Sequence, residues 1–99
     1  MSVNGARGEV GLMVDGEERR LCLTLGALAE IETAFACKEL AELNLRMRAL
    51  SAGDLVVVIA ALLRGGGEAE MAERVNKVDL SPGAAAKAVA EAFRLGLAS

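Results

Sequence analysis

The chain has 99 residues, 54% of them hydrophobic, and its eleven basic and fourteen acidic side chains give a formal net charge of −3. A chain of this length fits one domain, predicted to span residues 1–99, and its charge provides no field that attracts nucleic acid or an anionic membrane surface. Because only two residues are aromatic, the core must be assembled from many small aliphatic contacts, as in closely packed helices.

The two cysteines, Cys22 and Cys37, are expected to stay reduced. The N-terminal sequence MSVNGARGEV lacks the apolar core of a secretion signal, which favours a reducing cytoplasm over a disulfide. The longest apolar run, residues 55–63, falls well short of the roughly eighteen residues that a membrane-spanning helix needs. We therefore expect a cytoplasmic protein with no membrane partner.

The N-terminal part predicts a β-hairpin. Residues 1–7 are small and polar and are expected to be flexible, whereas apolar side chains recur at every second position over residues 10–14. Asp15-Gly16 follows, and this type of dipeptide fills the two positive-φ positions of a type I′ turn. The pattern predicts a hairpin at about residues 8–23.

Two registers are open for this hairpin. A two-residue loop pairs Val10 with Leu21, whereas a three-residue loop pairs Val10 with Cys22. We favour the first, because only that register places Leu21 and Leu23 on the face that carries Val10 and Leu12. A lone hairpin is marginal in water, so it must pack on helices or join a partner's sheet.

Two amphipathic helices are expected next. Thr24 is suited to cap the first, which has apolar residues at positions 25, 28, 31 and 35 and is expected to end near Ala36 or Cys37. On the second, Glu42 and Arg46 have the spacing of a helical ion pair. Its apolar stripe is formed by Leu40, Leu43, Met47 and Leu50.

The central helix is predicted at about residues 52–64. Ser51 and Asp54 form an N-terminal capping signature, and Gly65 to Gly67 supply a C-terminal stop. Apolar residues, Val56 among them, cover most of the circumference between these ends, so other elements must cover this helix on several sides.

The C-terminal third predicts two more helices. A polar helix spans residues 68–77 with Met71 and Val75 on one side, and Ser81-Pro82 begins a helix that runs to about Leu97. The whole pattern predicts an α+β fold, mostly α, in which an N-terminal hairpin precedes four to five helices packed around the central one.

No catalytic, cofactor or metal site is predicted. The chain has no histidine, which excludes Ser/His and Cys/His nucleophilic pairs and the usual zinc sets. The triple glycine lacks the Gly-Lys-Ser/Thr ending of a phosphate-binding loop. A thiolate at Cys22 is the remaining enzymatic alternative, with Arg19 and Arg20 as the nearby cations. We expect a protein that is not an enzyme.

The stripe of the second helix has two interpretations. Leu40, Leu43, Met47 and Leu50 form either part of the internal core or a groove-forming face that takes a partner helix. Met47 suits both, because its side chain is adaptable. These four residues are the candidate partner-binding site.

Three segments carry a resemblance to a known family. In order, NGARGEV, DGEERRLCLTLGALAEIETAF and LSAGDLVVVIAALLRGGG resemble the small proteins encoded in the tail-gene cluster of gene transfer agents, which are phage-derived particles. These proteins are grouped with phage tail assembly chaperones and in some descriptions are labelled tail tube proteins. The resemblance spans nearly the whole chain and departs at Ala36, where a glycine is expected.

The resemblance implies a chaperone that binds the tape-measure protein and assists polymerisation of the tail tube around it. The tail tube protein and further copies of the chain are additional candidate partners. The structural alternative is a tail component that stays in the particle, its hairpin pairing edge to edge between subunits.

Overall fold

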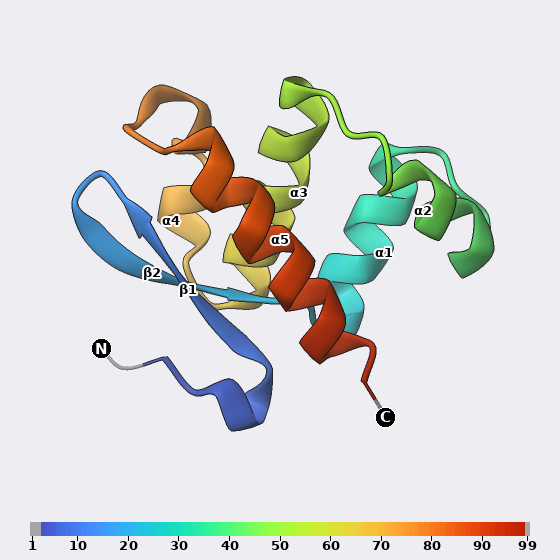
Figure 1. Cartoon of the computed structure of the whole chain (residues 1–99), viewed down its shortest axis with the longest axis horizontal. Helices are drawn as coiled ribbons and strands as arrows, with labels where there is room; N and C mark the ends of the chain where they lie inside the picture. Colours follow the sequence, from blue (N-terminus) through green and yellow to red (C-terminus); the bar gives the residue numbers. More distant parts are fainter. Residues whose placement is uncertain (1–2, 99) are drawn as a thin grey trace.

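A β-hairpin and five α-helices make up residues 3–98, the part of the chain that this computed structural model describes (Figure 1). The predicted α+β, mostly α fold is confirmed. The elements are η1 (Gly5–Arg7), β1 (Glu9–Val14), β2 (Glu17–Cys22), α1 (Leu25–Ala34), α2 (Leu40–Arg46), α3 (Ala52–Gly65), α4 (Ala69–Ala72), η2 (Val75–Lys77) and α5 (Pro82–Gly96), where η denotes a single 3₁₀ turn.

The hairpin has the register of the two-residue loop. Val10 pairs with Leu21 and Val14 with Glu17, as predicted. Asp15 and Gly16 both have positive φ, 54° and 83°, which matches the right-handed twist of the two strands. Leu12, Val14 and Leu21 therefore share one buried face, whereas Met13 lies on the other face and is exposed.

Side chains cap three of the helices at their first turns. Thr24 accepts the Ala27 N–H at 3.1 Å, and Ser81 accepts the Ala84 N–H at 3.3 Å ahead of α5. Ser51 and Asp54 form the predicted capping box, in which each side chain accepts the other residue's N–H.

The first and third helices end in the same way, each with one residue in the left-handed conformation. After α3, Gly67 has φ of 84°, and the Glu68 N–H donates to the Leu63 carbonyl at 2.8 Å. After α1, Ala36 takes this role with φ of 56°. The helix thus ends at Ala34, two residues before the expected position, on a residue that adopts this conformation less readily than glycine.

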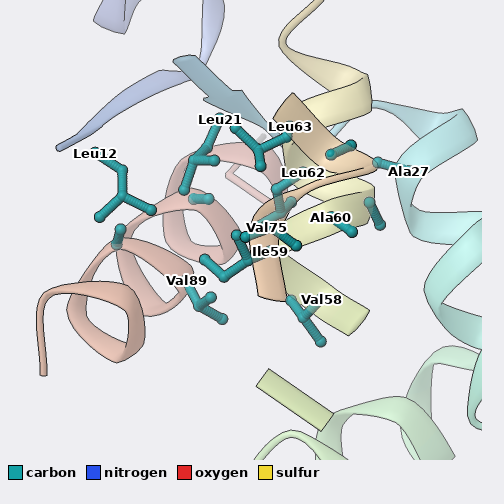
Figure 2. Close-up of a cluster of buried hydrophobic side chains, with 14 of the residues drawn as sticks. Leu12, Leu21, Ala27, Val58, Ile59, Ala60, Leu62, Leu63, Val75 and Val89 are labelled. Carbon is teal, nitrogen blue, oxygen red and sulfur yellow. The ribbon is translucent and has the colours of Figure 1, made fainter. Parts of the chain in front are cut away.

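The core surrounds the C-terminal half of α3. Residues 58–63 are all buried, and Figure 2 shows Ile59, Leu62 and Leu63 among side chains from the hairpin and α5, such as Leu21 and Val89. The helix contacts β2, α1, α4 and α5. Val56 and Val57 in its first half are each about one-third exposed. Other elements therefore cover α3 on several sides, as predicted, only over its second half.

Two other details differ from the expectations. Leu25 is 82% exposed, because at the first position of α1 its side chain faces solvent while Ala27 and Ile31 turn inward. The helix expected at residues 68–77 is broken into α4 and η2, although Met71 and Val75 are buried on one side as predicted.

Part of the N-terminal segment is structured. Asn4 caps the η1 turn by accepting the Ala6 N–H at 3.1 Å. Residues 1 and 2, which belong to the segment expected to be flexible, lie outside the described residues. Within residues 3–98, each helix is too short or too polar to cross a membrane.

The triple glycine also joins α3 to the hairpin. A Cβ on Gly65 would collide with the carbonyl oxygen of Cys22, and one on Gly66 with that of Arg20. Glu68, directly after the glycines, accepts the Arg20 N–H at 3.0 Å. The end of α3 therefore approaches the outer edge of β2 at a distance that only glycine permits.

We predict that Gly66→Ala lowers the free energy of unfolding by about 1 to 3 kcal/mol, because the added methyl group meets a backbone oxygen that cannot move aside. Gly66 has φ of −85°, so the loss would arise from space and not from backbone strain. The control is Gly53→Ala in the first turn of α3, where the nearest atom to a Cβ is 3.9 Å away. Urea unfolding measures both; equal midpoints for the two variants would contradict the prediction.

Candidate partner-binding groove

The structure separates the four residues of the predicted partner-binding stripe. Leu43 is 0% exposed and belongs to the core, whereas Leu40 is 46% exposed at the start of α2. Met47 and Leu50 lie beyond the last turn of α2, half-buried against the core. The interpretation as core therefore fits Leu43. Met47 and Leu50 also pack against the core but keep part of their surface open, whereas Leu40 is exposed and does not line a groove with them.

Met47 and Leu50 line an apolar groove between the α2 segment and α5. Its volume is about 590 Å³. Asn44 completes the α2 side, and the α5 side consists of Ala86, Val89, Ala90, Phe93, Arg94, Leu97 and Ala98. The groove is open to solvent between these two sides, and the buried side chains of Leu43 and Val89 anchor α2 and α5 on the core.

The α5 side of this groove was missed by the sequence analysis. Val89, Phe93 and Leu97 recur at i, i+4 and i+8, a row that indicates a buried helix face. In the structure this row changes character along the helix: Val89 is buried, Phe93 is half-buried, and Leu97 is 45% exposed. The exposure of Leu97 indicates that this end of the row belongs to a groove. The sequence does not reveal this exposure, because it depends on the position of α2.

One charged contact ties α2 to the start of α3. Arg46 Nη1 lies 2.8 Å from Asp54 Oδ2, and its guanidinium group lies 4.6 Å above the centre of the Phe35 ring. Arg46 also donates to the carbonyl of Ala49 at 3.3 Å. Among the described ion pairs, Arg46 thus pairs with Asp54 across the intervening turn, and not with Glu42 as predicted.

This contact changes the titration of Asp54. The pKa of its carboxyl group is lowered to about 2, first by the hydrogen bond from Arg46 and then by the one from the Ser51 N–H. The same hydrogen bond raises the pKa of Arg46. Asp54 therefore both caps α3 and anchors α2.

Arg94, which lines the groove, is paired within α5. Its Nε donates to Glu91 Oε2 at 3.0 Å, and this bond lowers the pKa of Glu91. The groove is therefore apolar along its walls, with a neutralised charge pair at its margin. This arrangement is suited to apolar contact with another chain.

The cysteine considered as a nucleophile has an unfavourable setting for one. Burial raises the pKa of the Cys22 thiol, Glu9 raises it further, and Arg7 offsets this only in part. The two predicted cations, Arg19 and Arg20, instead lie beside Glu68. Cys22 and Cys37 are both free thiols. Within residues 3–98, His, Cys, Asp and Glu form no group of three that could hold a metal ion.

We predict that Leu43→Asp unfolds the domain, since an unpaired carboxylate in the core costs several kcal/mol, comparable with the whole stability of a small domain. Leu40→Asp, on the same stripe but largely exposed, serves as the control and should remain folded. Circular dichroism during urea unfolding measures both variants. A cooperative transition near the wild-type midpoint in the Leu43 variant would show that this side chain is not part of the core.

We also predict that the contribution of Asp54 depends on pH. Its pKa in the folded state is about 2, below the unfolded value near 3.9, so the carboxylate stabilises the folded state above about pH 4. This contribution is lost as the pH falls from about 4 to about 2. Wild type should therefore exceed Asp54→Asn in unfolding free energy at neutral pH, and the difference should shrink through this window. A difference that does not change with pH would exclude the Arg46 contact as its cause.

Comparison with known proteins identifies the family. A model of the family described as "phage tail tube protein, GTA-gp10" matches residues 7–98. No curated protein and no solved structure gave a match. Because the match covers the hairpin and all five described helices, the chain belongs to the GTA-gp10 family of phage tail proteins.

Proposed function

We propose that the chain is a tail assembly chaperone of a phage-like gene transfer agent, a protein that is not an enzyme and that binds the tape-measure protein during assembly of the tail tube. Membership of a phage tail family supports the setting. The observation that carries the proposal is the open apolar groove between the α2 segment and α5, lined by Met47, Leu50, Phe93 and Leu97.

The groove is suited to an amphipathic helix. Helices bind such surfaces through apolar side chains spaced at i, i+3, i+4 and i+7, and methionine on the receiving side adapts to different shapes. A groove of about 590 Å³ accommodates a few side chains of this kind and not a whole domain. We therefore infer that a short helical segment of the tape-measure protein binds here.

The few contacts that hold α2 on the domain support a transient complex with the tape-measure protein. This helix is fixed to the rest of the chain mainly by the buried side chain of Leu43 and by the contact between Arg46 and Asp54. Elements with few buried contacts move at low free-energy cost, so the groove can widen to admit a helix and close again on release. A chaperone that leaves the finished particle requires such reversibility. The free thiols agree with action in the cytoplasm.

Co-expression with the tape-measure protein tests this proposal. We expect wild type to keep that protein soluble in a complex, and we expect Met47→Asp and Leu97→Asp to weaken the complex about tenfold or more, because a carboxylate in an apolar contact loses hydration. The matched control is Leu45→Asp, on α2 but outside the groove and 68% exposed, which should bind as wild type does. The absence of both a complex and a gain in solubility with wild type would refute the proposal.

A structural component of the tail is the second candidate, favoured by the family description as a tail tube protein. Such a component would remain in the particle together with its partners. Mass spectrometry of purified particles separates the two functions: stoichiometric copies indicate a structural role, and absence indicates a chaperone.

A further inference from the structure

The two edges of the hairpin differ in how their backbone groups are satisfied. On β2 the outer edge is covered, because Arg20 donates its N–H to Glu68 and the glycines after α3 lie against its carbonyl groups. Since the Arg20 N–H points outward, the backbone of its register partner Gly11 also points away from the strand pair. The same alternation turns the backbone groups of Met13 outward.

The outer edge of β1 is open between two fixed ends. At one end the Glu9 N–H bonds the carbonyl of Asn4 at 3.1 Å, and at the other the Asp15 N–H bonds the carbonyl of Asp79 at 2.9 Å. Between these contacts, the outward N–H groups of Gly11 and Met13 have no hydrogen-bond partner among residues 3–98. This stretch also lacks the lysine or proline that usually protects an edge strand.

A groove of about 580 Å³ runs beside this open edge. Residues 10–13 of β1 form one side, and α5 forms the other through Ala84, Lys87, Ala88, Ala90, Glu91 and Arg94. The methyl groups of the alanines leave space beside the strand. Figure 1 shows α5 beside β1 along much of the hairpin. A strand edge facing a helix is the geometry in which an extended peptide binds by adding to a sheet.

We propose that an extended segment of another protein pairs with β1 at Gly11 and Met13. One face of this segment meets Ala84 and Ala88 and therefore carries small apolar side chains. The other face meets the carboxylate of Glu18, which is exposed and lies over Gly11 beside the side chain of Val3, so basic side chains with apolar stems complement it. The partner is thus an extended segment in which apolar and basic residues alternate.

A second copy of the chain fits this edge poorly. Pairing β1 with β1 of another copy brings the two strands to about 4.8 Å, and it places both α5 helices on the same face of the joined sheet. Each α5 packs on its own β1, whereas packed helices need about 8 to 10 Å between their axes. A strand without a helix attached meets no such obstacle. The site uses the side of α5 that faces β1. It shares only Ala90 and Arg94, on the ridge of α5 between the two grooves, with the groove proposed for the tape-measure protein.

A synthetic peptide of about eight residues that alternates lysine with valine tests the proposal by two-dimensional amide NMR of the full chain. We expect saturable shifts centred on the amides of Gly11 and Met13. Met13→Pro removes one outward N–H without breaking the pairing of β1 with β2, and it should weaken binding about tenfold. Met13→Val keeps the N–H and should change affinity by no more than about twofold.

A second pair of measurements keeps the test decisive if the proline variant unfolds. Glu18→Lys changes only an exposed side chain, so it should weaken the lysine peptide about tenfold and favour a matched peptide that alternates glutamate with valine. Equal binding of both peptides to both proteins would overturn the proposal, as would shifts confined to Phe93 and Leu97 in the other groove. Protection of Gly11 and Met13 that grows with protein concentration, together with a dimeric mass, would show that a second copy occupies the edge instead.

Discussion

The rest of the structure depends on the close approach of the α3 C-terminus to the outer edge of β2. Gly65 and Gly66 allow this approach, and Glu68 completes it by accepting the Arg20 N–H. A two-stranded sheet is marginal by itself, so the hairpin needs this contact to be held against the helices. Once it is held, its apolar face covers residues 58–63 of α3, and the buried half of the core helix is defined.

The same contact explains why other elements cover one half of α3 more completely than the other half. The hairpin, α1, α4 and α5 gather around the second half of α3. Its first half lies beside Val78 and Leu80 and keeps Val56 and Val57 about one-third exposed. The α2 segment contributes one fully buried side chain, Leu43. It is also held by Met47 and Leu50, half-buried against the core, and by Arg46 bonded to Asp54. The open groove beside Met47 therefore follows from a shortage of covering elements in a chain of 99 residues. Surface left apolar for this reason is available to a partner.

The features that could be predicted from the sequence are those that depend on neighbours in the chain. The turn at Asp15-Gly16, the register it sets and the capping box at Ser51 each involve residues within a few positions of one another. The missed features join distant segments. Arg46 pairs with Asp54 because a turn brings two helices together, and Leu97 becomes part of a groove because of where α2 lies. The triple glycine has one feature of each kind. Its role in ending α3 is local and could be predicted, whereas its contact with β2 joins distant segments and could not.

The position of α5 makes it the wall of both grooves. Its small residues are distributed around the helix, with Ala85 and Ala92 buried in the core, Ala84 beside β1 and Ala86 beside the α2 segment. Alanine allows close packing on the core and leaves the flanking surfaces shallow, while it keeps the helix intrinsically stable. A larger residue at either flank would fill a groove without improving the core. Packing on the core therefore explains only some of the alanines of α5. The others lie on the two open flanks, where their small side chains keep the grooves open.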